Sequence, residues 1–410
     1  MRNLKSLIIS LILLGLFFQN TLQEIIPLFQ YLDEVLAIAC IFLFLFDSIN
    51  YKKIKKIDLL IMVLMTLTVI VGIFGGIVSE LTPTLFWQFV DILSIFKFSF
   101  VILYLNNKNS IFTSKIDKKV IFKIVVPVLR TYLLILLFFC IENIFRDIGM
   151  NYGYRFGLRS FSFIYGTPGL IINQMTYSLI IFTIARIRQN KGNIGWEQIV
   201  TLIIILSTLR FRGFVLAFIY IVLFIFKHRT NKRKRRSYVL PLIVSTVIAI
   251  ILGKSQFSMY FLESNTPRQR FVLGALQLAK EYFPLGSGFG TFGSSVAADN
   301  YSLVYYQLGF NHYYGMSYQQ PLFLNDNYFP MILGQLGYLG TCLFIIFLFL
   351  VIKEFLVGYM HSKFLLLSIF VTVDILFSSI QSSYLAHYSV VALLFIFMSL
   401  SKNEVLKDDY

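Results

Sequence analysis

Apolar runs about as long as a membrane-spanning helix recur along the whole chain, and they limit its fold more than any other feature. A helix needs roughly twenty apolar residues to cross a bilayer, and fewer where the bilayer is locally thin. The candidate spans are 4–19, 30–49, 57–78, 85–105, 122–144, 163–185, 197–209, 213–227, 238–253, 328–352, 363–380 and 385–400. The sequence therefore predicts an all-α polytopic membrane protein of about twelve transmembrane helices, with residues 1–410 forming a single membrane domain.

The positions of the basic residues predict how these spans are oriented. If the N-terminus lies inside and the spans alternate, 25 of the 36 Lys and Arg residues fall in inner segments and nine in outer ones. This bias is the one that cytoplasmic loops show, so both termini are expected in the cytoplasm. It also accounts for the net charge of +16. The basic run Lys227–Arg236 is interpreted as a cytoplasmic stop signal beside anionic lipid, and no nucleic-acid partner is expected.

One long segment, residues 254–327, interrupts the apolar pattern with polar and aromatic residues. The topology makes it a large extracytoplasmic loop. Within it, residues 268–282 have apolar side chains at helical spacing, which predicts an amphipathic helix lying on the membrane surface. The glycines of Pro284-Leu-Gly-Ser-Gly-Phe-Gly290 predict a tight re-entrant turn. They do not follow a buried strand, so a nucleotide-binding loop is excluded.

The other chemistry-bearing residues do not form a metal or cofactor pattern. The four histidines are scattered, and the three cysteines lie in apolar runs without C-x-x-C spacing. No metal and no cofactor are therefore predicted. Within the spans, Asp33, Glu34, Asp91, Lys97 and Asp374 fit either a proton relay or structural ties between helices, and we favour structural ties.

Arginines collect in the predicted outer loops. They are Arg155, Arg159, Arg210, Arg212, Arg268 and Arg270. Guanidinium groups make bidentate, charge-assisted hydrogen bonds to phosphate oxygens, so a group of them suits a diphosphate. Arg155 and Arg159 also fit as solvated loop residues. Of Arg210 and Arg212, in a short hairpin, we expect one to point into a cavity. One of Arg268 and Arg270 is expected to bind an anion, because both open a helix whose dipole opposes their charge.

Several motifs in the second half of the chain resemble one family. They are Tyr165-Gly-Thr-Pro-Gly169, Ser207-Thr-Leu-Arg-Phe-Arg-Gly213, the arginine-opened helix at 268–270, the glycine turn at 284–290, Asp326-Asn-Tyr328 and Gly334-Gln-Leu-Gly-Tyr-Leu-Gly340. Together they are similar to the O-antigen polymerase and ligase superfamily, which includes the Wzy-type polymerases of capsule and exopolysaccharide. The resemblance covers most of the chain from about residue 150 onward.

The resemblance implies a GT-C-like, metal-independent membrane glycosyltransferase. Such an enzyme joins undecaprenyl-diphosphate-linked oligosaccharide repeat units into a capsular, exo- or O-antigen polysaccharide at the outer face of the bacterial cytoplasmic membrane. Its partners would be that lipid-linked oligosaccharide, the growing polysaccharide, membrane lipids, a flippase and a chain-length regulator. The alternatives are a ligase that transfers glycan to another acceptor and a lipid-linked oligosaccharide flippase or transporter. A transporter usually shows internal repeats, and none is visible here.

The resemblance also assigns roles to individual residues. Arg210 or Arg212, with Arg268 or Arg270, would hold the diphosphate of the donor. Ligases carry a histidine–asparagine pair where this chain has Asp326 and Asn327, so Asp326 is expected to be the general base toward the acceptor hydroxyl. Further substrate contacts are expected from Arg159, Asn327 and Tyr313. Tyrosine rings of the loop can stack on sugars or form an interfacial belt; they are Tyr305, Tyr306, Tyr313, Tyr314 and Tyr318.

Overall fold

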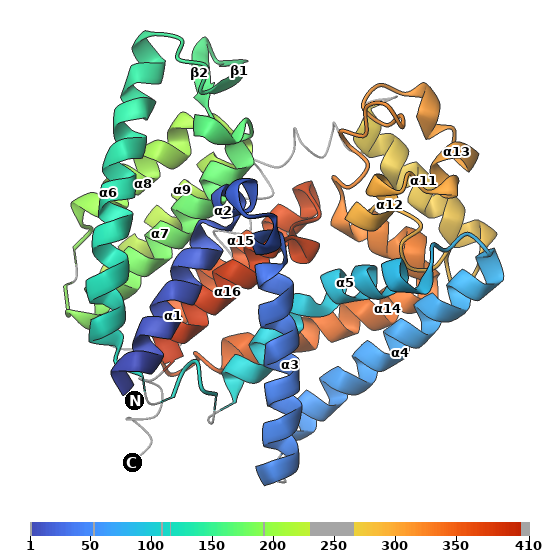
Figure 1. Ribbon diagram of the computed structural model, residues 1–410, viewed down its shortest axis with the longest axis horizontal. Helices are drawn as coiled ribbons and strands as arrows, with labels where there is room; N and C mark the ends of the chain where they lie inside the picture. Colours follow the sequence, from blue (N-terminus) through green and yellow to red (C-terminus); the bar gives the residue numbers. More distant parts are fainter. Residues whose placement is uncertain are drawn as a thin grey trace.

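The computed structural model describes residues 2–51, 54–107, 110–114, 116–191, 193–229 and 266–402, and most of them are helical (Figure 1). The long helices are α1 (Arg2–Phe17), α3 (Leu32–Tyr51), α4 (Lys56–Ser79), α5 (Leu85–Asn106), α6 (Lys118–Phe145), α7 (Pro168–Arg188), α8 (Trp196–Ser207), α9 (Phe211–Arg229), α11 (Pro267–Glu281), α14 (Tyr328–Val357), α15 (Leu365–Gln381) and α16 (Tyr388–Ser401). Short helices are α2 (Gln19–Ile25), α12 (Ser295–Asp299) and α13 (Leu303–Gln307). One antiparallel hairpin is formed by β1 (Asn151–Arg155) and β2 (Leu158–Phe161).

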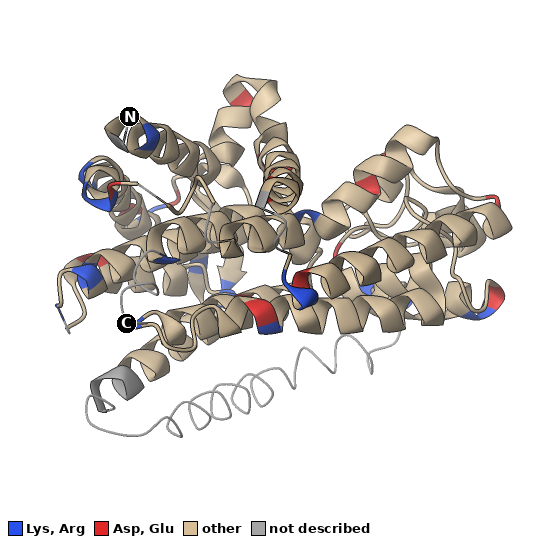
Figure 2. Cartoon of the chain, turned by 90° about the horizontal axis from the view of Figure 1, so that it is seen from below, with Lys and Arg blue, Asp and Glu red and all other residues tan. Residues whose placement is uncertain are grey.

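A helix coincides with each predicted span inside these ranges, whereas the predicted span 238–253 and the loop residues 254–265 lie outside them. By length and composition, α4, α5, α6, α7 and α14 can each cross a membrane. The pair α1 and α2, bent by 82°, is a sixth candidate if it is one broken span. Charged residues occupy only short stretches of the chain (Figure 2). The chain is therefore an all-α membrane protein, while helix length and composition alone do not establish twelve spans.

The helices form two packed groups. In Figure 1, α1, α6, α7, α8 and α16 lie together near the β hairpin, and α3, α4, α5 and α14 lie together beside them. Helix α16 contacts both α7 and α5 and so joins the two groups. The loop helices α11, α12 and α13 cover one end of α14 (Figure 1). Apolar side chains fill both groups, as expected for helices that are hydrophobic nearly all round.

A buried ionic network ties the N-terminal helices to α5. The ammonium group of Lys97 donates to Asp33 Oδ2 at 2.6 Å, and Gln19 Nε2 donates to Asp33 Oδ1 at 2.8 Å. The side chains of Lys97 and Asp33 are only 5% and 1% exposed. These contacts join α2, α3 and α5, so Asp33 and Lys97 act as a tie between helices, as we expected for this group.

We expect Lys97→Met to destabilise the folded protein by about 3–5 kcal/mol, because it leaves the Asp33 carboxylate buried without its cation. Thermal unfolding in detergent measures this. The double variant Lys97→Met/Asp33→Asn should recover part of the loss. Arg146→Met, which breaks an exposed ion pair with Glu142, should cost at most about 1 kcal/mol. An equal loss for the two single variants would contradict the role given to Lys97.

The glycine turn at 284–290 docks on a break in α14. Helix α14 is interrupted at Gly337, which has φ 60° and ψ −164°. The break leaves helical carbonyls available, and the amide groups of Ser287 and Gly288 donate to Gly334 O at 3.0 Å and Gln335 O at 2.8 Å. Leu339 N in turn donates to Pro284 O at 3.2 Å. The buried backbone of both segments is thereby hydrogen-bonded, as burial requires.

The loop from Thr266 onward has a hydrophobic core of its own, and this corrects one prediction. Helix α11 buries Phe271, Ala275 and Leu278 against other loop residues and against α14. Its apolar face is thus covered by protein, so the helix at 267–281 exists but does not use that face to lie on the membrane. Tyr305 is fully buried in the same core and donates to Leu324 O, so it is not available for stacking on a sugar.

Candidate functional site

Three of the predicted residues lie near one another although they come from distant parts of the chain. They are Arg210 between α8 and α9, Arg268 in the first turn of α11, and Asp326 just before α14. Each segment is positioned by local structure. Ser160 Oγ of β2 donates to Thr208 O at 2.6 Å and so connects the hairpin to the α8–α9 turn. Thr266 Oγ1 caps α11 by accepting from Gln269 N, which places the start of that helix.

Arg268 and Asp326 form an ion pair within this group. Arg268 Nη2 lies 3.7 Å from Asp326 Oδ2, and both side chains are about 30% exposed, at 31% and 29%. Burial raises the pKa of Asp326 above its ordinary value of 3.8, and the positive charges of Arg268 and Arg210 only partly offset this. Asp326 is therefore a carboxylate that two arginines stabilise and that accepts a proton more readily than a solvated aspartate does.

Arg210 lies among other cations. Its guanidinium carbon is 4.6 Å from the centre of the Tyr152 ring, a distance typical of a cation–π contact. Burial lowers the pKa of Arg210, and the positive charges of Arg155 and Arg268 lower it further. A bound anion would relieve this repulsion. We call Arg210, Arg268, Asp326, Tyr152 and Arg155 the arginine–aspartate cluster.

Arg212, only two residues from Arg210, has a different environment. Its Nη2 donates to Asp374 Oδ1 of α15 at 3.0 Å, and its guanidinium lies 4.6 Å from the centre of the Tyr384 ring. The Arg212 side chain is 11% exposed and that of Asp374 is fully buried. The pair is thus an internal tie between α9 and α15. Of the two arginines at the α8–α9 turn, Arg210 therefore belongs to the arginine–aspartate cluster, whereas Arg212 pairs with Asp374 inside the protein.

The other predicted substrate contacts have protein partners of their own. Arg270 lies with its guanidinium 4.5 Å from the centre of the Tyr313 ring, so two predicted residues contact each other. Arg159 Nη1 donates to the carbonyls of Asn143 and Ile144 at 3.3 Å each, which fastens the hairpin to the end of α6.

Asn327, the fifth predicted contact, is the N-cap residue of α14 and is 1% exposed. Within the ranges that the structure describes, neither polar atom of its side chain has a hydrogen-bond partner. A buried amide of this kind carries a desolvation cost that a ligand hydroxyl can remove. Asn327 therefore remains a candidate contact for a polar substrate next to Asp326.

The structure adds Tyr152 to the predicted residues, and it places Arg155, one of the predicted loop arginines, near Arg210. Both lie on β1, whose Asn151-Tyr-Gly-Tyr-Arg-Phe-Gly157 segment alternates aromatic and glycine residues in a manner typical of a hairpin. This pattern was the sequence signal from which the β hairpin could have been predicted. The cluster can bind a polyanion through its guanidinium groups and can accept a proton at Asp326.

Across the described part of the chain, no group of three or more His, Cys, Asp or Glu residues is arranged to hold a metal ion. A scan of protein-family models, a search of curated proteins and a search of solved structures each found no match to this chain.

Proposed function

We propose that this chain is a membrane-embedded polysaccharide polymerase, which joins undecaprenyl-diphosphate-linked repeat units at the outer face of the bacterial cytoplasmic membrane. The observation that carries the proposal is the convergence of Arg210, Arg268 and Asp326 from segments up to 116 residues apart in a chain whose helices suit a bilayer. Two cations for a diphosphate leaving group and one carboxylate for an acceptor hydroxyl are what this glycosyl transfer requires.

The proposed reaction transfers the donor glycan from its diphosphate to an acceptor hydroxyl. An acceptor hydroxyl oxygen attacks C1 of the donor sugar, and the bond from C1 to the diphosphate oxygen breaks. The bonding electron pair stays with the diphosphate, whose growing negative charge Arg210 and Arg268 stabilise. The hydroxyl proton passes to Asp326. The products are a glycan longer by one repeat unit or more and undecaprenyl diphosphate.

Arg268 has a double role in this scheme. In the structure it lies against Asp326. A bound diphosphate competes for the same guanidinium, and its arrival weakens the hold of Arg268 on the carboxylate. Asp326 is then less stabilised as an anion and becomes a stronger base at the time when the donor is in place. Donor binding would thus activate the group that receives the acceptor proton.

The proposed topology has twelve spans with both termini in the cytoplasm. The α8–α9 turn, the β hairpin and the loop from Thr266 to Asn327 then share the outer side. Support comes from α6, which starts among lysines at Lys118 and ends near the hairpin, about 40 Å away along a helix of 28 residues. Basic residues at one end and the cluster at the other agree with a positive-inside arrangement.

Deletion of the gene followed by complementation tests the proposed function. We expect the deletion strain to accumulate single repeat units on the lipid carrier at the outer face, and wild-type chain to restore long polymer. Repeat units that stay on the inner leaflet would identify a transporter instead. Long polymer retained on the carrier would identify a ligase. Either of these two outcomes would overturn the proposal.

Polymerisation is expected to fall as the pH drops through the pKa of Asp326, because a protonated carboxyl cannot accept the acceptor proton. Since Arg268 lowers the pKa of Asp326, Arg268→Gln should move this acid limb to higher pH in the residual activity. The pH profile of kcat/KM for purified protein in vesicles measures both effects, because it reports the pKa values of the enzyme without bound donor. The control is Asp299→Asn, which removes another loop carboxylate whose pKa is raised by burial. An acid limb that moves with Asp299→Asn but not with Arg268→Gln would contradict the role of Asp326.

A further inference from the structure

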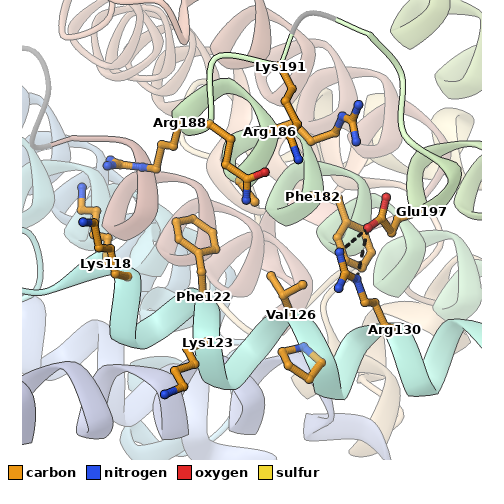
Figure 3. Close-up of a pocket in the computed structure, with 14 residues that line it drawn as sticks. Lys118, Phe122, Lys123, Val126, Arg130, Phe182, Arg186, Arg188, Lys191 and Glu197 are labelled. Carbon is orange, nitrogen blue, oxygen red and sulfur yellow. Dashed lines mark hydrogen bonds and ion pairs between the residues drawn. The ribbon is translucent and has the colours of Figure 1, made fainter.

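A second polar site lies at the opposite end of α6 from the arginine–aspartate cluster. There the start of α6, the end of α7 and the start of α8 enclose a cavity of about 710 Å³ (Figure 3). This volume is within the usual range for a small-molecule site. None of the residues discussed for the polymerase reaction lines it, so it has no part in the chemistry proposed above.

The lining of this cavity is strongly basic. Among the described residues that line it, seven are Lys or Arg and one, Glu197, is acidic. The carboxylate of Glu197 is already engaged, because Arg130 Nη2 and Nε donate to its Oε1 at 2.6 and 3.1 Å (Figure 3). The basic residues come from two sides, with Lys118 and Lys119 on α6 and Arg186 at the end of α7. The cavity therefore surrounds its contents with positive charge from more than one helix.

The cavity also has an apolar wall that continues deep along α6. Phe122, Val126 and Pro127 of α6 line it, and Phe182 of α7 faces them. From Lys118 to Arg130 the lining covers about 18 Å of helix axis, at 1.5 Å per residue. A soluble anion needs only the charged rim. An amphiphile with an anionic headgroup and acyl chains matches the rim and the wall together.

We propose that this cavity binds a phospholipid with two phosphates in its headgroup, of the diphosphatidylglycerol type. Cations on opposite sides of the cavity suit two phosphates better than one, and acyl chains would run along Phe122 and Val126 into the bilayer. Basic pockets between transmembrane helices at the cytoplasmic side are known to receive such headgroups. The lipid would fill the gap between α6 and α7 and hold their ends together.

Native mass spectrometry of the full chain in detergent tests this site. We expect wild-type protein to retain diphosphatidylglycerol about tenfold better than phosphatidylglycerol, because the second phosphate adds charge-assisted hydrogen bonds, and phosphatidylcholine hardly at all. Inorganic pyrophosphate at equal concentration should not displace the lipid. Equal retention of one-phosphate and two-phosphate lipids, or displacement by pyrophosphate, would overturn the proposal. These measurements need no variant and therefore stand even if a variant fails to fold.

The triple variant Lys118→Gln/Lys119→Gln/Arg186→Gln supplies the second test. Each basic residue near a lipid surface contributes about fivefold in affinity, so retention should fall on the order of 100-fold. The matched control Lys56→Gln/Lys353→Gln/Lys363→Gln removes the same charge from residues that do not line the cavity, and it should retain the lipid. An equal loss in both triple variants would show general attraction to anionic lipid and overturn a specific site.

Discussion

Arg210→Gln is expected to lower the rate of polymer extension about 100- to 1,000-fold, because removal of one preorganised donor to a developing negative charge has this effect in other enzymes. The partners of Arg210 explain why the change should leave the fold intact. Its guanidinium lies over the Tyr152 ring. The positive charges of Arg155 and Arg268 destabilise the protonated form of Arg210. Loss of that charge reduces repulsion in the protein and removes attraction for the diphosphate. Extension of a lipid-linked repeat unit by purified protein in vesicles measures the rate.

Arg212→Gln is the matched control, since it makes the same change two residues away. It should lower the melting temperature and the yield of folded protein, because Asp374 would remain buried without its cation. The double variant Arg212→Gln/Asp374→Asn should recover part of that stability. If instead Arg210→Gln were silent, while Arg212→Gln lost activity at an unchanged melting temperature, the roles of the two arginines would be reversed.

The positions of the helices could be predicted from the sequence because apolar length is a local property. The predicted spans 57–78 and 328–352 correspond to α4 at 56–79 and α14 at 328–357. The interruption of α14 at Gly337 could not be found in this way. It depends on the glycine turn about fifty residues earlier, whose amide groups bond to the carbonyls near the break. Hydropathy within one segment contains no information about such a partner.

The candidate site was predictable in composition but not in arrangement. Arg210 and Arg212 were equal candidates for the site, because both are cations in a predicted outer loop. Only Arg212 is paired with Asp374, which lies 162 residues away in the sequence, and this pairing distinguishes the two arginines. The periodicity of residues 268–282 indicated a helix with one apolar face. Whether lipid or protein covers that face depends on Phe292, Tyr305 and the rest of the loop core. Tertiary partners of this kind are not encoded in the spacing of one segment.

Gly288→Ala is expected to abolish polymerisation and to lower thermal stability together. Gly288 has φ 89°, a conformation that side chains adopt only with strain. An added Cβ would overlap Gly76 Cα of α4 and lie 2.6 Å from Gly76 N. Backbone atoms cannot rotate away as a side chain can, so strain and overpacking should together cost several kcal/mol. Because Arg268 and Asp326 flank this turn in one loop, lifting it from α4 and α14 would also separate both residues from Arg210.

Gly309→Ala provides the control for backbone strain alone. Gly309 lies in the same loop with φ 68°, but an added Cβ there meets only the His312 ring, at 4.0 Å. This variant should keep most of its activity and lose no more than about 1–3 kcal/mol of stability.

A second pair of variants tests whether the clash at Gly288 is with backbone or with side-chain atoms. In Gly76→Ala the added Cβ would meet the Thr82 methyl group at 2.5 Å, and Thr82→Ser removes that methyl group. We therefore expect Thr82→Ser to rescue Gly76→Ala but not Gly288→Ala. Rescue of both would mean that the Thr82 side chain, and not contact with the α4 backbone, limits how closely the turn can dock.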